Sequence, residues 1–392
     1  MRGDMQRVHL KRTKRIHGGH LWVFSNEIYE NLKGYIPGSL VELFDRQENF
    51  LGTGYINPNS LISIRILSWE RAEINRDFFK RRLREAFDLR ERLFEDRDAL
   101  RLIYSEGDYL PGLIVDKYGK CIVLQLLTAG IETFKDLIIE LLDDMLDPDT
   151  IVLKNESRSR SLEGLSLYKE VAKGSLNELP VIEEGGVAFE VDPYEGQKTG
   201  FFLDQKENRR ALRRYVKGGR GLDLFCYTGA WSLSLASQGA EMTGIDESES
   251  AIKRAVKNAE MNSLQGRAAF VQDNVFSFLK RKTAEEGEKY DVIVCDPPAF
   301  VKSSAKIKEA VRAYRELNSL CMGLIKPGGL LATSSCSYHL GKDLFLDVLR
   351  DASRDAKRGL RLIELRSQDR DHPVLLSMPE TEYLKCAFLV VD

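Results

Sequence analysis

The sequence has few of the features that mark secreted, membrane-bound or metal-binding proteins. No apolar run approaches the ~18 residues that a membrane span needs, and the opening stretch MRGDMQRVHLKRTKR is too polar for a signal peptide. The six cysteines stand far apart without a CxxC pair, which argues against structural zinc and against a disulfide framework. The five histidines form no metal-ligand spacing. These absences predict a cytoplasmic protein with no metal and no membrane contact.

What remains is an ordinary globular composition with an uneven distribution of charge. A chain of 392 residues suggests two or three domains, and 43% hydrophobic residues suffice for sizeable cores. The net charge is only −2, yet residues 1–26 hold six basic residues against one acidic residue. Their cluster Lys11, Arg12, Lys14 and Arg15 could bind phosphates in a salt-dependent way, although a solvated terminus would have the same composition.

The pattern of apolar residues divides the chain into three expected domains. Residues 1–72 contain short strands separated by turn residues, as in a small β-barrel, at 21–28, 39–45, 50–57 and 61–68. Residues 73–180 combine strands with an amphipathic helix from Asn75 to about Leu100 and a helix over 131–145, which indicates a central α+β domain. Residues 181–392 alternate strands and helices. This alternation predicts an α/β domain with a parallel sheet covered by helices on both faces.

Polar residues follow the first three strands of this third domain, at the edge where such sheets bind ligands. The first strand leads into the sequence DLFCYTGA, which contains Asp223 and a single Gly229 and lacks the GxGxxG fingerprint of dinucleotide sites. The second strand ends in Asp246, which suits ribose hydroxyls. The third ends in Asp273 and Asn274. One such acid alone would indicate a helix cap, but three in register predict a nucleoside ligand without a pyrophosphate, S-adenosylmethionine (SAM) rather than NAD.

The next two strands end in groups with chemistry of their own. Asp296-Pro297-Pro298-Ala299-Phe300 follows the fourth strand, and the two prolines would hold the carboxylate and the aromatic ring rigidly. The fifth ends in SSCS, which places the thiol of Cys336 at the same edge. A thiolate that adds to carbon 6 of a pyrimidine makes carbon 5 able to accept a methyl group. A nearby carboxyl group can stabilise the charge of the adduct.

Several motifs resemble known methyltransferases. DLFCYTGA, GIDESESAI, VQDNVFSFL and DPPAF are similar to the successive motifs of class I SAM-dependent methyltransferases. Residues 195–209 (EGQKTGFFLDQKENR) and HLWVFSNEI at 20–28 resemble the PUA-domain-containing ribosomal RNA cytosine-5 methyltransferases, although Leu21 stands where many relatives have proline. The resemblance implies an N-terminal PUA-type β-barrel, a small central α+β domain and a C-terminal Rossmann-like methyltransferase domain.

The resemblance also implies a substrate and a set of site residues. The activity would be methylation of carbon 5 of a cytosine in large-subunit ribosomal RNA, with Cys336 as nucleophile and Asp296 beside it. A homodimer is compatible with the resemblance, and no motif specifies one. The residues expected around SAM are Thr199, Phe202, Asp204, Gln205, Asp223, Phe225, Tyr227, Thr228, Gly229, Asp246, Asp273, Asn274 and Asp296. Those expected to contact RNA are Pro297, Pro298, Phe300, Lys11, Arg12, Lys14 and Arg15.

Three alternatives stay open at this point. Related enzymes that methylate a guanine ring nitrogen share the FFLDQ-like and DPP elements and need no thiol. An RNA-binding assembly factor could keep the fold without turnover, although the intact Asp296 and Cys336 argue against this. A methyltransferase of small molecules is least favoured, because it would leave the two additional domains without a task.

Overall fold

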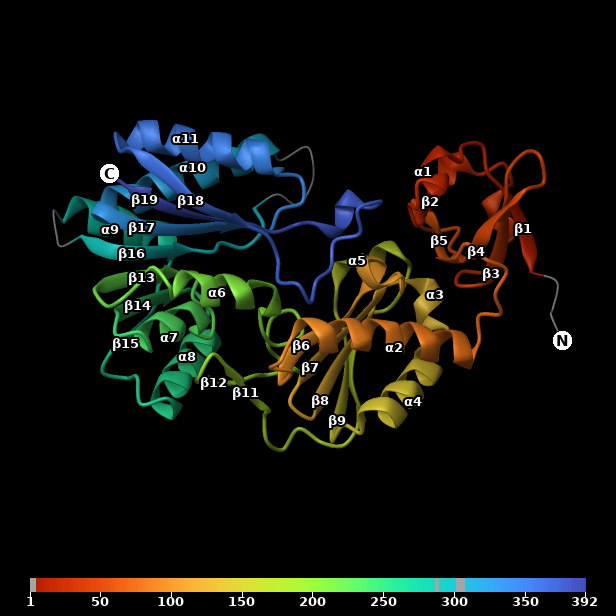
Figure 1. Cartoon of the computed structure of the whole chain (residues 1–392), viewed down its shortest axis with the longest axis horizontal. Helices are drawn as coiled ribbons and strands as arrows, with labels where there is room; N and C mark the ends of the chain where they lie inside the picture. The colour runs from red at the N-terminus through yellow and green to blue at the C-terminus, as the bar shows by residue number, and fades with distance from the viewer. Residues whose placement is uncertain (1–4, 286–288, 301–306) are drawn as a thin grey trace. The chain divides into compact units, whose positions relative to one another are not determined.

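The computed structural model describes residues 5–285, 289–300 and 307–392 and forms two compact units (Figure 1). The first unit comprises Met1–Ile182, Val191–Leu203 and Arg370–Thr381. The second comprises Glu183–Glu190, Asp204–Asp369 and Glu382–Asp392. Two short segments from beyond residue 190 therefore fold with the N-terminal part of the chain. The three expected domain ranges themselves stay a prediction.

The N-terminal part of the first unit is a five-stranded sheet in the order β1-β3-β4-β5-β2. Its strands are β1 (Gln6–His9), β2 (Trp22–Phe24), β3 (Leu40–Phe44), β4 (Phe50–Ile56) and β5 (Ile62–Ser68), with the short helix α1 (Lys14–His17) before β2. The pairs are antiparallel except β1 with β3. Three of the four expected strands are confirmed. The one expected over 21–28 is shorter, because the Glu27 carboxylate accepts the backbone N–H of Phe24 at 2.9 Å and Ser25–Glu27 form a 3₁₀ turn after β2. The strand β1 is additional, because its short and polar sequence gives little signal.

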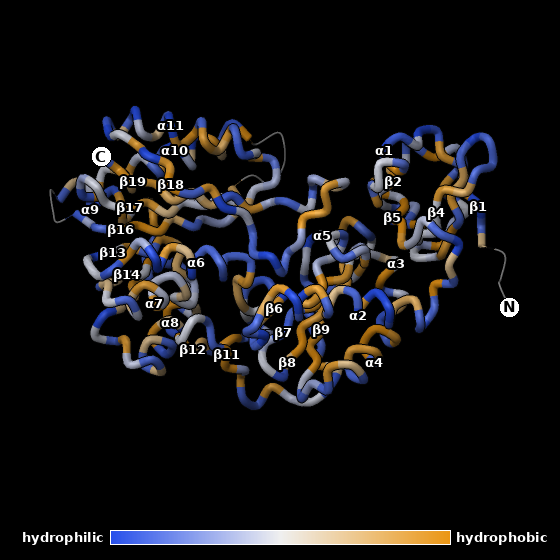
Figure 2. The backbone as a smooth tube through the Cα atoms, in the orientation of Figure 1, coloured by the Kyte–Doolittle hydropathy of each residue, from blue (hydrophilic) through white to orange (hydrophobic). Residues whose placement is uncertain are grey.

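A second five-stranded sheet, in the order β10-β9-β8-β7-β6, forms the middle of the first unit. Its strands are β6 (Ala99–Tyr104), β7 (Leu113–Tyr118), β8 (Cys121–Leu126), β9 (Thr150–Asn155) and β10 (Tyr168–Lys173). The helices are α2 (Arg76–Leu93), α3 (Ala129–Glu132), α4 (Lys135–Leu146) and α5 (Arg158–Leu162). Figure 2 shows that the central strands are largely hydrophobic, and their side chains share one core with α2 and α4.

Two helix predictions in this part are wrong in detail. The helix expected to reach about Leu100 ends at Leu93, because the Asp96 carboxylate accepts the backbone N–H of Asp98 and starts a turn before β6. The helix expected over 131–145 is two helices, α3 and α4. The Thr133 hydroxyl donates to the carbonyl of Gly130 and ends the first of them.

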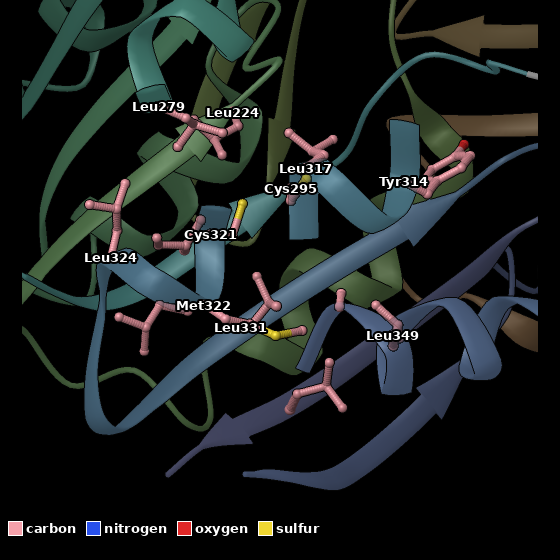
Figure 3. Close-up of a cluster of buried hydrophobic side chains, with 14 of the residues drawn as sticks. Leu224, Leu279, Cys295, Tyr314, Leu317, Cys321, Met322, Leu324, Leu331 and Leu349 are labelled. Carbon is pink, nitrogen blue, oxygen red and sulfur yellow. The ribbon is translucent and has the colours of Figure 1, made fainter. Parts of the chain in front are cut away.

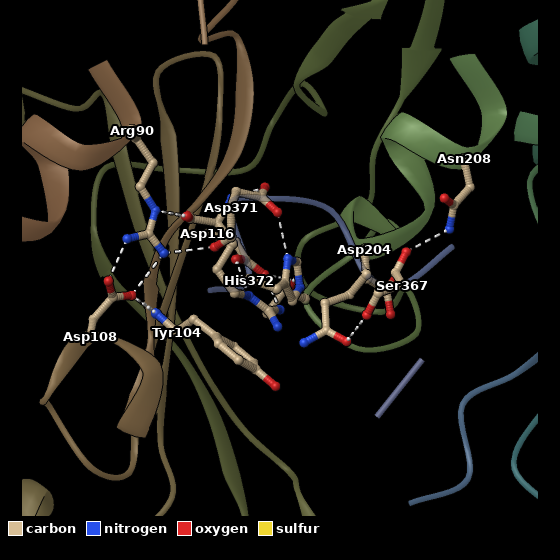
Figure 4. Close-up of polar contacts among 12 residues, drawn as sticks. Arg90, Tyr104, Asp108, Asp116, Asp204, Asn208, Ser367, Asp371 and His372 are labelled. Atoms are coloured by element: carbon tan, nitrogen blue, oxygen red, sulfur yellow. Dashed lines mark hydrogen bonds and ion pairs between the residues drawn. The ribbon is translucent and has the colours of Figure 1, made fainter. Parts of the chain in front are cut away.

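Buried charges tie one of the C-terminal segments to the middle sheet (Figure 4). Arg90, only 1% exposed, donates two hydrogen bonds to the Asp108 carboxylate and one, of 2.6 Å, to the carbonyl of Asp371. The Asp371 carboxylate in turn accepts the backbone N–H of Arg101 at 2.8 Å. A buried charge that loses its partner is costly. These bonds therefore fix residues 370–372 within the first unit.

The second unit is built on a seven-stranded sheet in the order β15-β14-β13-β16-β17-β19-β18. The strands are β13 (Arg220–Leu224), β14 (Glu241–Asp246), β15 (Ala268–Gln272), β16 (Tyr290–Cys295), β17 (Ile325–Ser335), β18 (Leu360–Arg366) and β19 (Lys385–Val391). The first five are parallel, and β19 runs antiparallel between β17 and β18. The expected α/β fold is confirmed. A hairpin of β11 (Val181–Glu184) and β12 (Val187–Glu190) precedes this sheet.

Helices cover both faces of this sheet (Figure 1). One face carries α6 (Lys206–Leu212), α7 (Ala230–Ala236) and α8 (Glu249–Met261), and the other carries α9 (Val275–Ala284), α10 (Ile307–Leu324) and α11 (Lys342–Ala356). Side chains of the last three helices and of the central strands form one buried cluster, which includes Leu224, Tyr314 and Leu331 (Figure 3). This core holds the ends of the parallel strands at fixed positions.

Two features are absent from the described residues. No helix among them combines the length and the apolar character that a membrane crossing requires. The same residues contain no group of three or more His, Cys, Asp or Glu side chains placed to hold a metal ion.

Candidate active site

The order of the strands locates the candidate site. The chain runs from β13 outward to β14 and β15, and then returns to β16 on the other side of β13. Such a reversal opens a crevice beyond the carboxyl ends of the two central strands. Leu224 is paired with Cys295 at these ends, so the residues that follow, Phe225 and Asp296, begin the two loops that border the crevice.

The turn after β13 has a strained backbone. Phe225, Tyr227 and Gly229 have φ angles of 65°, 49° and 83°, and this left-handed conformation is unfavourable for the first two. At Gly229 a β-carbon would lie 2.7 Å from the ring of Phe270, so a side chain cannot be accommodated there. The backbone N–H of Tyr227 donates to Asp246 at the end of β14, at 2.9 Å. The turn is therefore held in one shape by its neighbours.

Buried polar atoms beside this turn fit a polar ligand. Asp223 is fully buried, and one carboxylate oxygen accepts hydrogen bonds from the Ser232 backbone N–H at 2.9 Å and from its hydroxyl at 2.7 Å. The other oxygen of Asp223 and the hydroxyl of Thr228 have no hydrogen-bond partner among the described residues. Asp246 accepts one backbone N–H on each oxygen, from Tyr227 and Ser248. A carboxylate oxygen can accept a second hydrogen bond, so Asp246 fits a ribose hydroxyl.

Burial raises the pKa of Asp223 to about 7, against the lowering effect of the Ser232 hydrogen bonds. The ionised form of Asp223 therefore lowers the free energy of unfolding. This destabilisation is absent at a pH below the pKa of Asp223 in the unfolded chain, grows as the pH rises, and is complete above pH 7. We expect Asp223→Asn to raise the free energy of unfolding at pH 8 by up to about 4 kcal/mol, and by about half of this at pH 5.5. Urea denaturation at the two pH values measures the difference.

Asp291→Asn is the matched control for this prediction. Asp291 opens β16 at the opposite edge of the same sheet, where partial burial is outweighed by hydrogen bonds from the Arg220 backbone and Lys326 that lower its pKa. Its removal should therefore destabilise the protein at pH 8. Equal effects of the two substitutions at both pH values would contradict the role of burial at Asp223.

The end of β15 acts as a helix cap in this structure. The Asp273 carboxylate accepts the backbone N–H of Asn274 at 2.7 Å and pairs with Arg281, whose guanidinium lowers the pKa of Asp273. The Asn274 side chain accepts the backbone N–H of Ser277 at 2.9 Å and so begins α9. The expected contact of Asp273 and Asn274 with SAM stays a prediction.

Asp296, after β16, is held by side chains from two different segments. Gln205 donates its amide to both carboxylate oxygens at 3.0 Å and to the hydroxyl of Ser334 at 3.1 Å. The indole of Trp231 donates to the same carboxylate at 3.2 Å. Gln205 was expected at the cofactor, whereas Trp231 and Ser334 were not expected at all. Trp231 lies two residues after Gly229, and nothing in the sequence distinguishes it from an ordinary core residue.

Cys336, directly after β17, differs from the other cysteines in its exposure. It is partly exposed, and the other five are buried. Burial raises the pKa of Cys121 and Cys386 to about 12, and that of Cys226 and Cys295 well above the usual range. The thiolate is the reactive form of cysteine. Among these sulfur atoms, Cys336 is therefore the one suited to nucleophilic chemistry.

The segment that precedes α6 divides between the two units. Thr199 donates to the Asp116 carboxylate and is hydrogen-bonded to the Tyr118 hydroxyl at 2.9 Å, all within the first unit, to which Phe202 also belongs. Asp204 belongs to the second unit, where it accepts the hydroxyl of Tyr383 at 2.6 Å. All four expected positions in this segment are at least partly buried, and their contact with SAM stays a prediction.

The residues expected to contact the substrate base lie in the loop after β16. Pro297 is buried and Pro298 is exposed. The ring of Phe300 packs on Tyr314, with centroids 4.9 Å apart, and on Phe276 at 6.3 Å. Phe300 is thereby anchored to α9 and α10, and its contact with a base stays a prediction.

The basic cluster of the N-terminal sheet faces solvent. Lys11, Arg12 and Lys14 are exposed, whereas Arg15 is half-buried, pairs with Glu27 at 2.8 Å and lies 4.8 Å above the ring of Phe24. Arg12, Arg15 and Phe24 line a cavity of about 420 Å³ together with Asn26, Glu27 and Leu61. The cluster therefore offers both exposed cations and an aromatic wall.

Comparison with protein families identifies two parts of the chain. Residues 7–69 match a PUA-like domain. Residues 159–375 match the S-adenosylmethionine-dependent methyltransferases. The second match covers more than half of the chain and contains the ends of the five parallel strands β13 to β17.

Similar proteins extend over the whole length. A protein of Erwinia tasmaniensis named ribosomal RNA large subunit methyltransferase I is 40% identical over 95% of this chain and 96% of its own. A protein of the same name from Shewanella denitrificans is 38% identical over 97% of this chain and 98% of its own. A solved structure from Streptococcus mutans, of a protein described as a candidate SAM-dependent methyltransferase, shares the fold with a TM-score of 0.84 at 23% identity, covering 98% of this chain and 100% of that one.

These matches agree with the geometry of the sheet. The reversal of strand order, the strained turn after β13 and the unpartnered buried oxygens next to it all suit a nucleoside cofactor. The chain belongs to the SAM-dependent methyltransferases that carry an N-terminal PUA-like domain.

Proposed function

We propose that this protein transfers a methyl group from SAM to carbon 5 of a cytosine in large-subunit ribosomal RNA, with Cys336 as the nucleophile. The choice of RNA is supported by the relatives named ribosomal RNA large subunit methyltransferase I. The choice of carbon 5 rests on one observation: the partly exposed cysteine follows β17, next to the strand β16 that Asp296 follows. Methylation of a guanine ring nitrogen gives no role to such a thiol.

The residues around the turn after β13 would hold the cofactor. Asp246 would accept the ribose hydroxyls, and the unpartnered oxygen of Asp223 and the Thr228 hydroxyl would meet polar atoms of the ligand. When bound, SAM supplies a methyl group on a positively charged sulfur. The left-handed turn at Phe225–Gly229 would bring backbone close to this ligand.

Cys336 and Asp296 would act on the cytosine. The thiolate of Cys336 forms a bond to carbon 6, and the electron pair of the 5,6 double bond becomes available at carbon 5 to accept the methyl group. Loss of the carbon-5 proton to a base and departure of the thiolate then restore the double bond. Asp296, fixed by Gln205 and Trp231, would interact with the polar edge of the ring while charge develops.

The N-terminal domain would position the RNA. The exposed Lys11, Arg12 and Lys14 suit phosphates, and the cavity beside Phe24 suits an unstacked base. Proteins recognise RNA through its shape and through unpaired bases, so no linear motif in the protein sequence specifies the target. A target cytosine inside a helix would have to leave its stack to reach Cys336.

Transfer of labelled methyl from SAM to unmodified ribosomal RNA, followed by mass analysis of the nucleosides, tests this function. We expect 5-methylcytidine in large-subunit RNA. A methylated guanosine would contradict the proposal and support the ring-nitrogen reaction. Tight binding of SAM and RNA without any product, on naked RNA and on precursor particles alike, would instead support an assembly factor.

A further inference from the structure

A buried lysine lies beside the proposed nucleophile. Lys385 is the first residue of β19 and is paired with Ser335, the last residue of β17, so that Cys336 follows directly on the neighbouring strand. Its side chain is only 4% exposed. Lysine is almost never this buried unless its charge has partners. The ammonium group of Lys385 is therefore expected to have specific partners at this place.

The ammonium group holds the loop that carries Cys336. It donates to the carbonyl of Ser337 at 2.7 Å and to the carbonyl of Tyr383 at 2.9 Å. An ammonium has three donors, and the third N–H meets no acceptor among the described residues. Because one anchor is the residue directly after Cys336, the loop on which the thiol sits is fixed to β19.

The charges around Lys385 come from three segments. Burial lowers the pKa of Lys385 to about 8, although the negative charges of Cys336 and Glu382 oppose this, and the positive charge of Lys342 adds to it. Glu382 is itself paired with Lys342 at 2.7 Å, and the charge of Cys336 is the first of the two negative charges that raise the pKa of Lys385. Attraction between two groups is mutual, so a positive charge on Lys385 favours the thiolate.

We propose that Lys385 is a positioning residue for the methyl transfer: it anchors the loop after β17 and its ammonium group stabilises the thiolate form of Cys336. The inference rests on the proposed function, because it assigns Lys385 to the activation of that nucleophile. The charge acts across the strand pair β17–β19 and needs no contact with SAM or RNA. It acts only while the amine is protonated, so its effect declines as the pH rises through 8.

Alkylation of Cys336 by iodoacetamide, followed by peptide mass analysis as a function of pH, tests this inference in the full-length protein. The other five cysteines are buried and should react slowly, which makes the readout specific. We expect Lys385→Met to raise the pH midpoint of Cys336 alkylation by about one unit, which is roughly a tenfold lower rate at pH 7. An unchanged midpoint in a folded Lys385→Met protein would overturn the proposal.

Two further variants separate charge from structure. Lys385→Arg keeps a permanent positive charge and should leave the midpoint within about 0.3 units of wild type. If Lys385→Met does not fold, Lys385→Arg provides the test instead. A midpoint of Cys336 alkylation in Lys385→Arg at about 8.5, the value of an ordinary thiol, would then overturn the proposal. Lys342→Met removes an exposed, paired lysine nearby and should change the rate less than twofold.

The outcome is independent of the test of the proposed function, because alkylation requires no methyl transfer. If Cys336→Ala keeps full methylation activity, the proposed function fails, while a shifted midpoint still establishes the coupling of Lys385 to the thiol. If Cys336→Ala is inactive and Lys385→Met has an unchanged midpoint, only the role of Lys385 fails.

Discussion

Cys336→Ala is expected to abolish formation of 5-methylcytidine, with a fall in rate of at least about 10³-fold. The physical reason is that carbon 5 of cytosine is a poor nucleophile unless a group adds to carbon 6, and no other cysteine sulfur is partly exposed among the described residues. The affinity for SAM should be preserved, because no contact expected around the cofactor involves this thiol. Methyl transfer under single turnover and calorimetric titration with SAM measure the two effects.

A direct test of the covalent step uses RNA with 5-fluorocytidine. Fluorine cannot leave carbon 5 as a proton does, so the thioether to Cys336 should accumulate and be visible as a mass increase of the protein. Cys226→Ala is the matched control, because Cys226 lies at the same edge of the sheet but is buried, with a pKa well above the usual range. This control should still form the adduct. An adduct on Cys336→Ala and none on Cys226→Ala would reverse the assignment.

The positions of Asp246, Asp296 and Cys336 could be predicted from the sequence for a simple physical reason. Parallel strands joined by helices all present their carboxyl ends at one edge of the sheet. A residue that directly follows a strand is therefore placed as soon as the strand is recognised. The alternation of strands and helices is strong in the second unit, and the structure confirms it from β13 to β17.

The contacts between these residues could not be predicted in the same way. Trp231 meets Asp296 only because α7 packs on the sheet with that indole toward β16. Lys385 lies beside the loop of Cys336 because β19 inserts antiparallel next to β17, a pairing that no local pattern encodes. Thr199, taken from the resemblance as a cofactor residue, is hydrogen-bonded to Asp116 and Tyr118 of the middle sheet. Long-range packing decides such contacts, and local sequence carries little information about it.

Asp296→Asn is the second substitution for which we expect a large effect. The new amide keeps the size of the side chain but removes the negative charge and brings an NH₂ group toward the donors of Gln205 and Trp231. Two donors facing each other leave a buried hydrogen bond unmade, which costs roughly 1–3 kcal/mol. The rate of methyl transfer under single turnover should fall by about 10²- to 10³-fold, the range seen when one electrostatic contact to a transition state is lost.

Asp291→Asn serves again as the matched control, because Asp291 lies in β16 at the end opposite to Asp296 and pairs with Lys326. It should leave the rate of methyl transfer unchanged at temperatures where the protein is folded. Measuring the rate of methyl transfer and the SAM affinity of Asp296→Asn separately then shows whether Asp296 acts on the cytosine or on the cofactor. A lower rate at saturating SAM, with unchanged SAM affinity, supports its action on the cytosine. A loss of SAM affinity with a normal rate at saturation would place Asp296 at the cofactor instead, and the interaction with the base would have to come from another residue at the ends of β16 and β17.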